Sequence, residues 1–348
     1  MSVEVLTVAN HRQLVDFCVF PTRIYSRSEN PNNINDPTGI FNPTQNPVMQ
    51  HLEGCNLLVF RDGKLVGRVA ATRDLLNPDP ATGFFGCFEC LNDPGAATAL
   101  LDGARDWLRE EGCTRMIGPA TFNTNQKVGM LVEGFEKGYQ YMMPFNPQYY
   151  PELMAAAGME KLTDLLTFRW RREQGIPAKV AAVAGRAARN PGVTLRRINL
   201  YHPAADVDLV RTVYNQSMSA NWGFIPLTRA EVAAMLSFCA GSADPDLLLA
   251  VLVDKQPAGI LLFTPSPFPS RPGLKSVRAA IMGVVPELRH RGLDSLMMLE
   301  AIKNLIKNGY HEADLSQIHE DNSVMLKIIT RVFEGEQTRR FRIYQCEV

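Results

Sequence analysis

Short apolar runs bounded by turn residues dominate the first quarter of this chain. Residues 56–60 and 65–71 are two such runs, and Asp62-Gly63 separates them. An Asp-Gly pair between two apolar runs is a strong β-hairpin signal. Residues 83–90 form a third strand-like run. We therefore predict three strands in succession, the first two joined by a tight turn.

A longer stretch with helical periodicity follows these strands. Asp93 suits the N-cap position of a helix and Pro94 suits its first turn. Apolar residues then recur at intervals of three and four until Gly112, which is typical of a helix that ends on a glycine. Residues 116–122 are apolar again. This pattern predicts one helix between the third and fourth strands.

The second half of the chain repeats this order of elements. A predicted hairpin is followed by a strand, a long amphipathic helix that ends at Gly309, and another strand; these strands cover residues 247–253, 258–263, 277–285 and 313–318. The repeat also appears in the numbering, because 309 minus 112 and 322 minus 125 both give 197, for a Gly pair and an Asn pair. We infer a duplicated domain of mixed α/β type.

The repeat sets the expected domain boundaries. We predict a first domain over residues 1–170, a linker helix within 171–193, and a second domain over 194–348. Within the first domain, residues 21–50 hold five prolines and many asparagines, which disfavours regular helix or sheet. We expect a long loop there.

Composition narrows the class of protein. The 348 residues include 36 Lys plus Arg and 36 Asp plus Glu, and the formal charge is +0; this balance gives no reason to expect nucleic acid as a partner. The seven cysteines are scattered, odd in number, and unlike a secreted disulfide scaffold. Because no apolar run approaches the ~18 residues of a membrane span, we expect a cytoplasmic protein. Peripheral membrane contact and oligomeric state stay open.

The segment from Val284 to Asp294 carries the clearest chemistry. An apolar strand ending at Val284 and Val285 leads into a basic loop, and the loop opens a long helix. A helix N-terminus presents unpaired backbone N–H groups and a partial positive charge, so it can bind phosphate. The residues of this candidate anion site are Val284, Val285, Arg289, His290, Arg291, Gly292, Leu293 and Asp294.

This segment resembles the pyrophosphate loop of the GNAT acyltransferase superfamily, whose pattern is Arg-x-x-Gly-x-Gly/Ala after an apolar strand. The resemblance implies two tandem GNAT-like domains and an acyl-coenzyme A thioester as co-substrate. It also places Asn322 in the cofactor-binding set. Residues 89–95 occupy the matching place in the first domain and contain no arginine, so we expect that domain to be degenerate.

The chain departs from the family pattern at two positions. Asp294 stands where the family has a small residue, and Ile329 stands where many members have a general-acid tyrosine. The strand 277–285 carries no carboxylate either. Glu320 and His319, at a strand-to-helix junction, are the remaining candidate acid–base groups, although a helix cap formed by a neighbouring residue is the alternative. A lone Cys87-x-x-Cys90 pair lacks further ligands nearby, so no metal is expected.

A narrower resemblance concerns the acceptor side. The segment Asn221-Trp222-Gly223-Phe224 is similar to a substrate loop of a tandem-GNAT-like bacterial family that includes ceramide synthases, and Tyr150 falls in a second shared motif. The resemblance implies Asn221, Trp222, Phe224 and Tyr150 as substrate-binding residues. The alternative for Trp222 and Phe224 is anchoring of the loop on the core, and the alternative for Tyr150 is packing within the fold. It predicts an acyl-coenzyme A-dependent N-acyltransferase acting on a small-molecule amine, with a long acyl chain one option. The alternative is a catalytically silent protein that binds a coenzyme A thioester or serves assembly.

Overall fold

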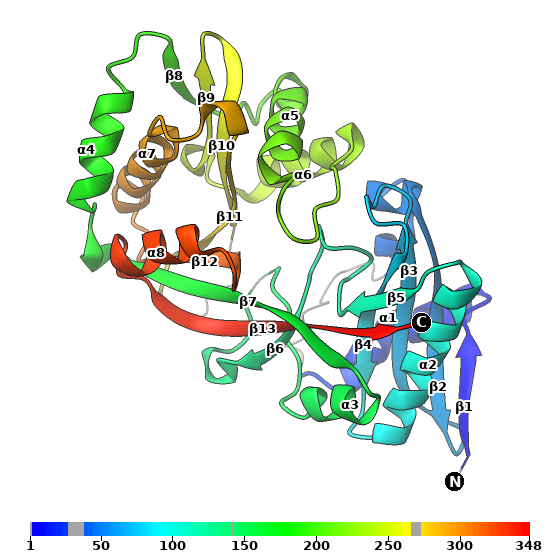
Figure 1. The fold of residues 1–348 in the computed structure, drawn as a ribbon. Helices are drawn as coiled ribbons and strands as arrows, with labels where there is room; N and C mark the ends of the chain where they lie inside the picture. Colours follow the sequence, from blue (N-terminus) through cyan, green and yellow to red (C-terminus); the bar gives the residue numbers. More distant parts are fainter. Residues whose placement is uncertain (1, 27–37, 141, 266–272) are drawn as a thin grey trace. The chain divides into compact units, whose positions relative to one another are not determined.

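The computed structural model describes residues 2–26, 38–140, 142–265 and 273–348 (Figure 1). The chain divides into two compact units. Unit 1 comprises Met1–Leu165, Gly223–Ile225 and Arg339–Val348, and unit 2 comprises Leu166–Trp222 and Pro226–Thr338. Of the loop predicted over residues 21–50, residues 27–37 lie outside the described part.

Unit 1 is a sheet with helices packed on it. Its strand order is β1-β2-β3-β4-β5-β13, and β6 also pairs with β13. The elements are β1 (Val3–Thr7), α1 (His11–Val19), β2 (Leu52–Arg61), β3 (Lys64–Asp74), β4 (Thr82–Cys90), α2 (Pro94–Glu110), β5 (Arg115–Gly118), β6 (Met130–Glu133), α3 (Tyr150–Ala156) and β13 (Glu336–Glu347).

Local sequence explains the first elements of unit 1. Asp62 and Gly63 adopt φ angles of 49° and 75° between β2 and β3, which is the left-handed geometry of a tight hairpin turn. The Asp93 carboxylate accepts the Ala96 N–H at 3.0 Å and caps α2. Apolar residues of α2, including Leu100 and Leu101, are fully buried against the sheet. The predicted hairpin, strand and helix are confirmed.

Unit 2 has the strand order β7-β12-β11-β10-β9-β8. Its elements are β7 (Glu160–Arg171), α4 (Ala178–Ala187), β8 (Val193–Arg197), α5 (Val207–Met218), α6 (Arg229–Ser242), β9 (Leu248–Val253), β10 (Gln256–Pro265), β11 (Ser276–Val284), α7 (Leu293–Lys307), β12 (Glu312–His319) and α8 (Ser323–Arg331). The linker segment folds as helix α4, which packs against α7 (Figure 1).

The two units repeat one strand order. Antiparallel strands β1 to β4 of unit 1 match β8 to β11 of unit 2, and each series ends in a parallel partner, β5 or β12. A long helix joins the last two strands in both units. This common order confirms the duplication predicted from the sequence.

The terminal strands of the two halves are exchanged. The C-terminal strand β13 pairs with β5 of unit 1, with Tyr344 opposite Gly118 (Figure 1). Strand β7, which ends the first half, contributes Leu166–Arg171 to unit 2 beside β12. Each unit is therefore completed by a strand from the other half of the sequence.

Candidate functional site

Strands β11 and β12 of unit 2 separate part-way along their length. Their parallel pairing runs from Ser276 opposite Glu312 to Ala279 opposite Leu315. Beyond that point β11 continues to Val284 and β12 to His319 without further pairing. A bulge between Leu262 and Phe263 of β10 lies at the same level. The edge of β11 from Ala280 onward is consequently open for another extended chain to pair with it.

The loop that follows β11 leads to the N-terminus of α7. Gly292 has a φ of 77°, and no side chain caps this helix start. Within the described residues, we find no acceptor for the backbone N–H groups of Arg291, Gly292 and Leu293. Unpaired N–H groups at a helix N-terminus suit an anion. The structure thus places the predicted loop residues around one uncapped helix start.

Arg289 has a structural role in this loop. Its Nε donates to Val284 O at 3.2 Å and its Nη2 donates to Ser217 O at 2.8 Å. The side chain therefore ties the loop to the end of α5. The Val285 N–H donates to Ala258 O at 2.9 Å, so this amide is also used within the fold.

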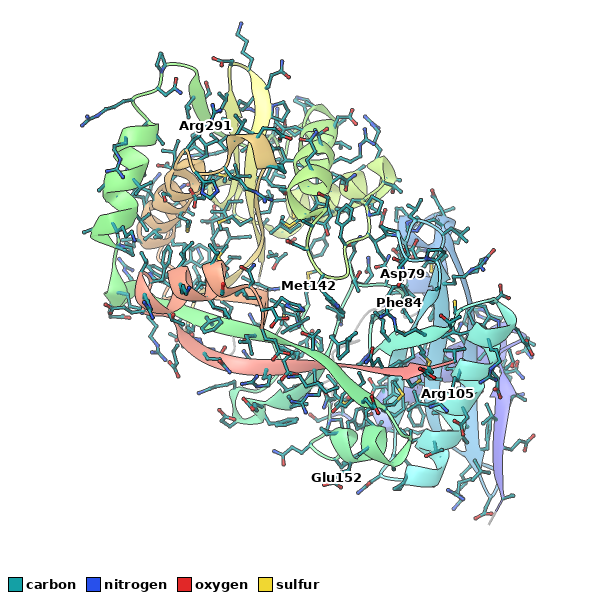
Figure 2. All side chains as sticks on the ribbon, in the orientation of Figure 1. Asp79, Phe84, Arg105, Met142, Glu152 and Arg291 are labelled. Carbon is teal, nitrogen blue, oxygen red and sulfur yellow. The ribbon has the colours of Figure 1, made fainter. Side chains whose placement is uncertain are left out.

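Helix α4 adds basic residues that the sequence analysis did not assign to the site. A Cβ built on Gly292 would lie 2.8 Å from Val183 Cγ1 and 3.4 Å from Ala187 Cβ, so the end of α4 packs directly on the loop. Arg186 lies in the last turn of α4, and Arg189 follows just beyond its end. Both are exposed, as is Arg291 (Figure 2), and within the described part of the chain none of the three makes an ion pair. The only sequence signal was their position in the linker.

The corresponding place in unit 1 is filled by protein. Pairing of β4 with β5 ends at Phe84 opposite Ile117, and the Ala120 N–H then donates to Phe85 O at 2.8 Å. A Cβ on Gly86 would collide with the Ala120 carbonyl. The helix that follows is capped by Asp93, which also forms a two-bond ion pair with Arg61. At this position unit 1 therefore offers neither an open edge between β4 and β5 nor an uncapped start of α2.

The predicted acid–base residues lie at the end of β12. The His319 Nδ1 accepts the Asp321 N–H at 3.2 Å, so the neutral imidazole carries its proton on Nε2. Glu320 is half-buried beside it. Asn322 caps α8 by accepting the Met325 N–H at 3.1 Å. Ile329 is 4% exposed and packs in an apolar cluster, so a proton donor is absent at that position.

The predicted substrate loop is divided between the units. Trp222 of unit 2 lies with its ring centroid 5.7 Å from that of His319, and the exposed Asn221 donates its backbone N–H to Met218 O. Phe224 belongs to unit 1, within the short segment Gly223–Ile225. There the Asn125 Nδ2 donates to Ile225 O at 2.9 Å.

Tyr150 lies inside unit 1. It is 1% exposed, and its hydroxyl donates to Glu89 Oε2 at 2.7 Å and accepts the Cys90 N–H at 3.0 Å. Tyr25 donates to the same carboxylate oxygen at 2.8 Å. Burial raises the pKa of Glu89, although Arg68 and the two tyrosines counteract part of that effect. The sequence pattern identified Tyr150 but not its carboxylate partner.

This buried carboxyl gives a first prediction. A carboxyl with a raised pKa in the folded protein contributes its stability at low pH and loses it as the pH rises through that raised pKa. We expect the free energy of unfolding of Glu89→Gln, relative to the parent, to improve as the pH increases above the ordinary value of 4.5. Urea unfolding across pH 4–8 measures this difference. The exposed Glu152→Gln is the charge-matched control, and a difference that is flat with pH would contradict the prediction.

The described part of the chain lacks two features that would suggest other functions. No group of three or more His, Cys, Asp and Glu side chains there could hold a metal ion. No helix among the same residues has both the length and the apolar character that a membrane crossing requires.

Comparison with known proteins gives consistent matches. No protein-family model matches the chain. The bacterial ceramide synthase of Caulobacter vibrioides is 28% identical, covering 99% of this chain and 97% of the relative. Protein YghO of Escherichia coli is 27% identical, with 99% and 95% covered.

Solved structures show the same fold. A tandem GNAT protein from the clavulanic acid biosynthesis pathway superposes with a TM-score of 0.61 at 14% identity, covering 99% of this chain and 98% of that one. A probable N-acyltransferase from Enterococcus faecalis V583 gives a TM-score of 0.59 at 9% identity, covering 100% of this chain and 73% of that one. The chain therefore has the tandem GNAT fold and resembles the bacterial ceramide synthase along its whole length.

Proposed function

We propose that this protein is an acyl-coenzyme A-dependent N-acyltransferase whose donor site lies in unit 2. The observation that carries this proposal is the open edge of β11, which leads directly to the uncapped N-terminus of α7. An extended pantetheine arm can pair with such an edge, and a pyrophosphate suits the helix start. Arg186, Arg189 and Arg291 supply positive charge there.

The reaction is the transfer of an acyl group from sulfur to nitrogen. A neutral amine attacks the thioester carbon, the C–N bond forms, and the C–S bond breaks with its electron pair leaving on sulfur. Backbone N–H groups at the open β11 edge stabilise the carbonyl oxygen as it becomes negative. The amine proton passes to a base, and the thiolate takes up a proton.

Glu320 is the better candidate for the base. The His319 Nδ1 lone pair already accepts the Asp321 N–H, so proton uptake at this atom would cost that hydrogen bond. The neighbouring Glu320 carboxylate is then the other candidate for a general base. We expect Glu320→Gln to lower kcat more than His319→Gln does, because glutamine at position 320 cannot accept the amine proton.

The acceptor in this proposal is a small-molecule amine. The name of the full-length relative, bacterial ceramide synthase, supports a long-chain acyl donor and a sphingoid-type amine. The direct test is acylation of a panel of amines by acetyl, octanoyl and palmitoyl coenzyme A, followed by mass spectrometry of the products. If no pair of amine and acyl-coenzyme A gives an amide, the proposal is wrong.

A second candidate function is binding of a coenzyme A thioester without catalysis. The buried Ile329, at the place where many relatives of this fold have a tyrosine, favours it. The two functions differ in outcome, because a silent protein binds the thioester in calorimetry but forms no amide. Only amide formation in the acylation assay supports the proposed enzyme activity.

Charge reversal at the loop gives a further prediction. Arg291→Glu should weaken coenzyme A binding about tenfold at low ionic strength, and less at high salt, because the exposed charge is screened. The matched control is Arg109→Glu on α2 of unit 1, which changes the net charge equally and should leave the affinity unchanged. Isothermal titration of both variants also gives the stoichiometry, for which we expect one site per chain.

A further inference from the structure

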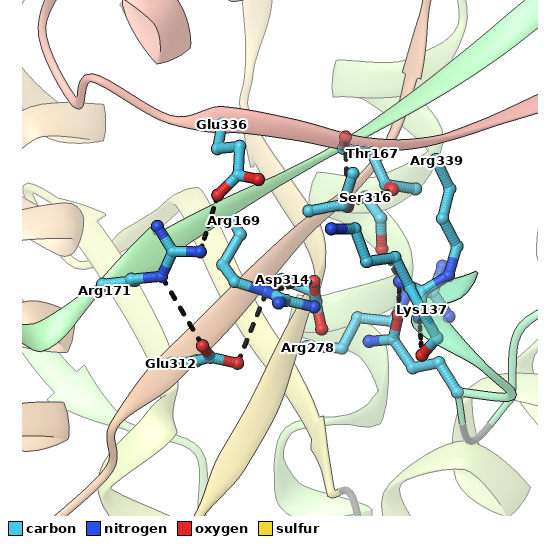
Figure 3. Close-up of polar contacts among 12 residues, drawn as sticks. Lys137, Thr167, Arg169, Arg171, Arg278, Glu312, Asp314, Ser316, Glu336 and Arg339 are labelled. Atoms are coloured by element: carbon cyan, nitrogen blue, oxygen red, sulfur yellow. Dashed lines mark hydrogen bonds and ion pairs between the residues drawn. The ribbon is translucent and has the colours of Figure 1, made fainter. Parts of the chain in front are cut away.

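The only charged side chain on β11 lies at the point where this strand leaves β12. Arg278 is opposite Asp314, one pair before the pairing ends at Ala279 and Leu315. Its Nε donates to Ser316 Oγ at 2.8 Å (Figure 3). The guanidinium therefore spans the two strands at the vertex of their separation, among side chains of β11 that are otherwise uncharged.

The charge of Arg278 is only partly compensated. Burial lowers the pKa of Arg278 to about 10, and the nearby Asp314 opposes that effect. Glu312 and Asp314 also face Arg169, whose Nε lies 3.4 Å and 3.7 Å from their carboxylate oxygens (Figure 3). The arginine remains protonated at neutral pH, in surroundings that stabilise its charge poorly.

The terminal nitrogens of Arg278 have capacity for another partner. Over the residues that the structure describes, Nη1 and Nη2 donate no hydrogen bond to the protein, and Nε alone makes the contact with Ser316. A half-buried guanidinium whose two amino groups make no hydrogen bond to the protein binds oxygen acceptors well, and its planar fork suits two oxygens at once. If Arg278 served only to join the two strands, its Nε would be sufficient and its two terminal amino groups would have no role.

The position of Arg278 relates it to the acceptor. If the donor lies along the open edge of β11 from Ala280 to Val284, the vertex beside Arg278 marks the inner end of that edge. The attacking amine must approach the thioester carbon to about 3–3.5 Å. Groups that neighbour the amine are then within reach of a side chain as long as arginine.

We propose that Arg278 binds a hydrogen-bond-accepting oxygen carried by the acceptor close to its reacting amine, as in an amino alcohol or an amino acid. This inference rests on the proposed N-acyltransferase function and specifies its substrate class. Arg278 then selects oxygen-bearing amines over plain alkylamines, because a bound alkylamine excludes water from the guanidinium without offering it an acceptor.

The test compares three acceptors of equal chain length: an alkylamine, its 2-amino alcohol and its 2-amino acid. We expect the parent to prefer at least one oxygen-bearing acceptor by about tenfold or more in kcat/KM, the size of a hydrogen bond to a charged group. Arg278→Met should reduce this ratio towards one, and Arg278→Lys should retain part of it. Which acceptor wins distinguishes a neutral hydroxyl from a carboxylate.

Ser316→Ala is the matched control, since it removes the contact between the strands and keeps the guanidinium. It should retain the preference. An equal loss for all three acceptors in Arg278→Met, or a preference that survives in that variant, would overturn the inference. If the parent acylates no amine at all, the proposed function itself fails. Thermal unfolding of each variant checks the fold, and Arg278→Lys serves if Arg278→Met does not fold.

Discussion

Asp164→Ala should lower the free energy of unfolding of unit 1 by about 3–5 kcal/mol, because it removes the buried centre of an ion-pair network. The Asp164 side chain is 1% exposed. It accepts hydrogen bonds from Arg342 at 2.9 and 3.1 Å and from Arg340 at 3.2 Å. Removing this carboxylate leaves two arginines of β13 without their shared partner. Chemical denaturation measures the change in the free energy of unfolding.

The same carboxylate makes the effect depend on pH. Burial alone would raise the pKa of Asp164, but hydrogen bonds from Arg342 and Lys161 outweigh burial and lower it. A carboxyl with a lowered pKa stabilises the fold above its ordinary pKa and loses that contribution as the pH falls through its folded pKa. The difference in the free energy of unfolding between Asp164→Ala and the parent should therefore decrease as the pH falls. The exposed Asp106→Ala, which breaks an ion pair with Arg109 on α2, should cost less than about 1 kcal/mol; a similar cost for both variants would contradict this account.

Gly292→Ala should both destabilise unit 2 and weaken coenzyme A binding by about tenfold or more, because the loop that presents the helix amides must shift to fit the new methyl group. Two costs combine at this position. A φ of 77° costs alanine about 1–2 kcal/mol. In addition, the new Cβ would lie 2.8 Å from Val183 Cγ1, so α4 must shift away from the loop. Calorimetry and thermal unfolding report the two effects.

Two further variants separate these costs. Gly309→Ala at the end of α7 has a φ of 75° with no atom within 4 Å of the new Cβ, so it carries the backbone cost alone and should keep full affinity. The double variant Gly292→Ala with Val183→Ala removes the contact with Cγ1 and should recover part of the lost stability. Equal effects of Gly292→Ala and Gly309→Ala on binding would show that the loop does not hold the phosphate.

The fold could be predicted from the sequence where local patterns decide it. Asp62-Gly63 forms the expected turn, Asp93 caps its helix, and Gly112 and Gly309 adopt left-handed φ angles at two helix ends. The exchange of β7 and β13 could not be predicted in this way. Both strands are compatible with either sheet by pattern, and pairing between residues so far apart, such as Gly118 with Tyr344, leaves no local signal.

Only part of the candidate site could be predicted from the sequence, because local patterns reveal some of its residues and tertiary packing determines the others. The loop around Gly292 follows from residue types at fixed spacing, and the structure confirms an uncapped helix start there. Arg289 is predicted to bind the ligand, and in the structure its Nε and Nη2 also hold the loop through Val284 O and Ser217 O. Arg186, Arg189 and Arg278 went unassigned because their environment depends on tertiary packing. The roles of the predicted ligand residues stay predictions until binding is measured.

The exchange of terminal strands also governs the order in which this protein can fold as it is synthesised. The edge of β5 at Gly118 pairs with Tyr344, so more than 200 further residues must be translated before this pairing can form. At about 5–20 residues per second, the delay is roughly 10–45 s. Throughout that interval the growing chain presents an unpaired strand edge, which is a known route to aggregation. Unit 1 is synthesised first, yet it is completed last, and we expect chaperones to engage the nascent chain during this wait.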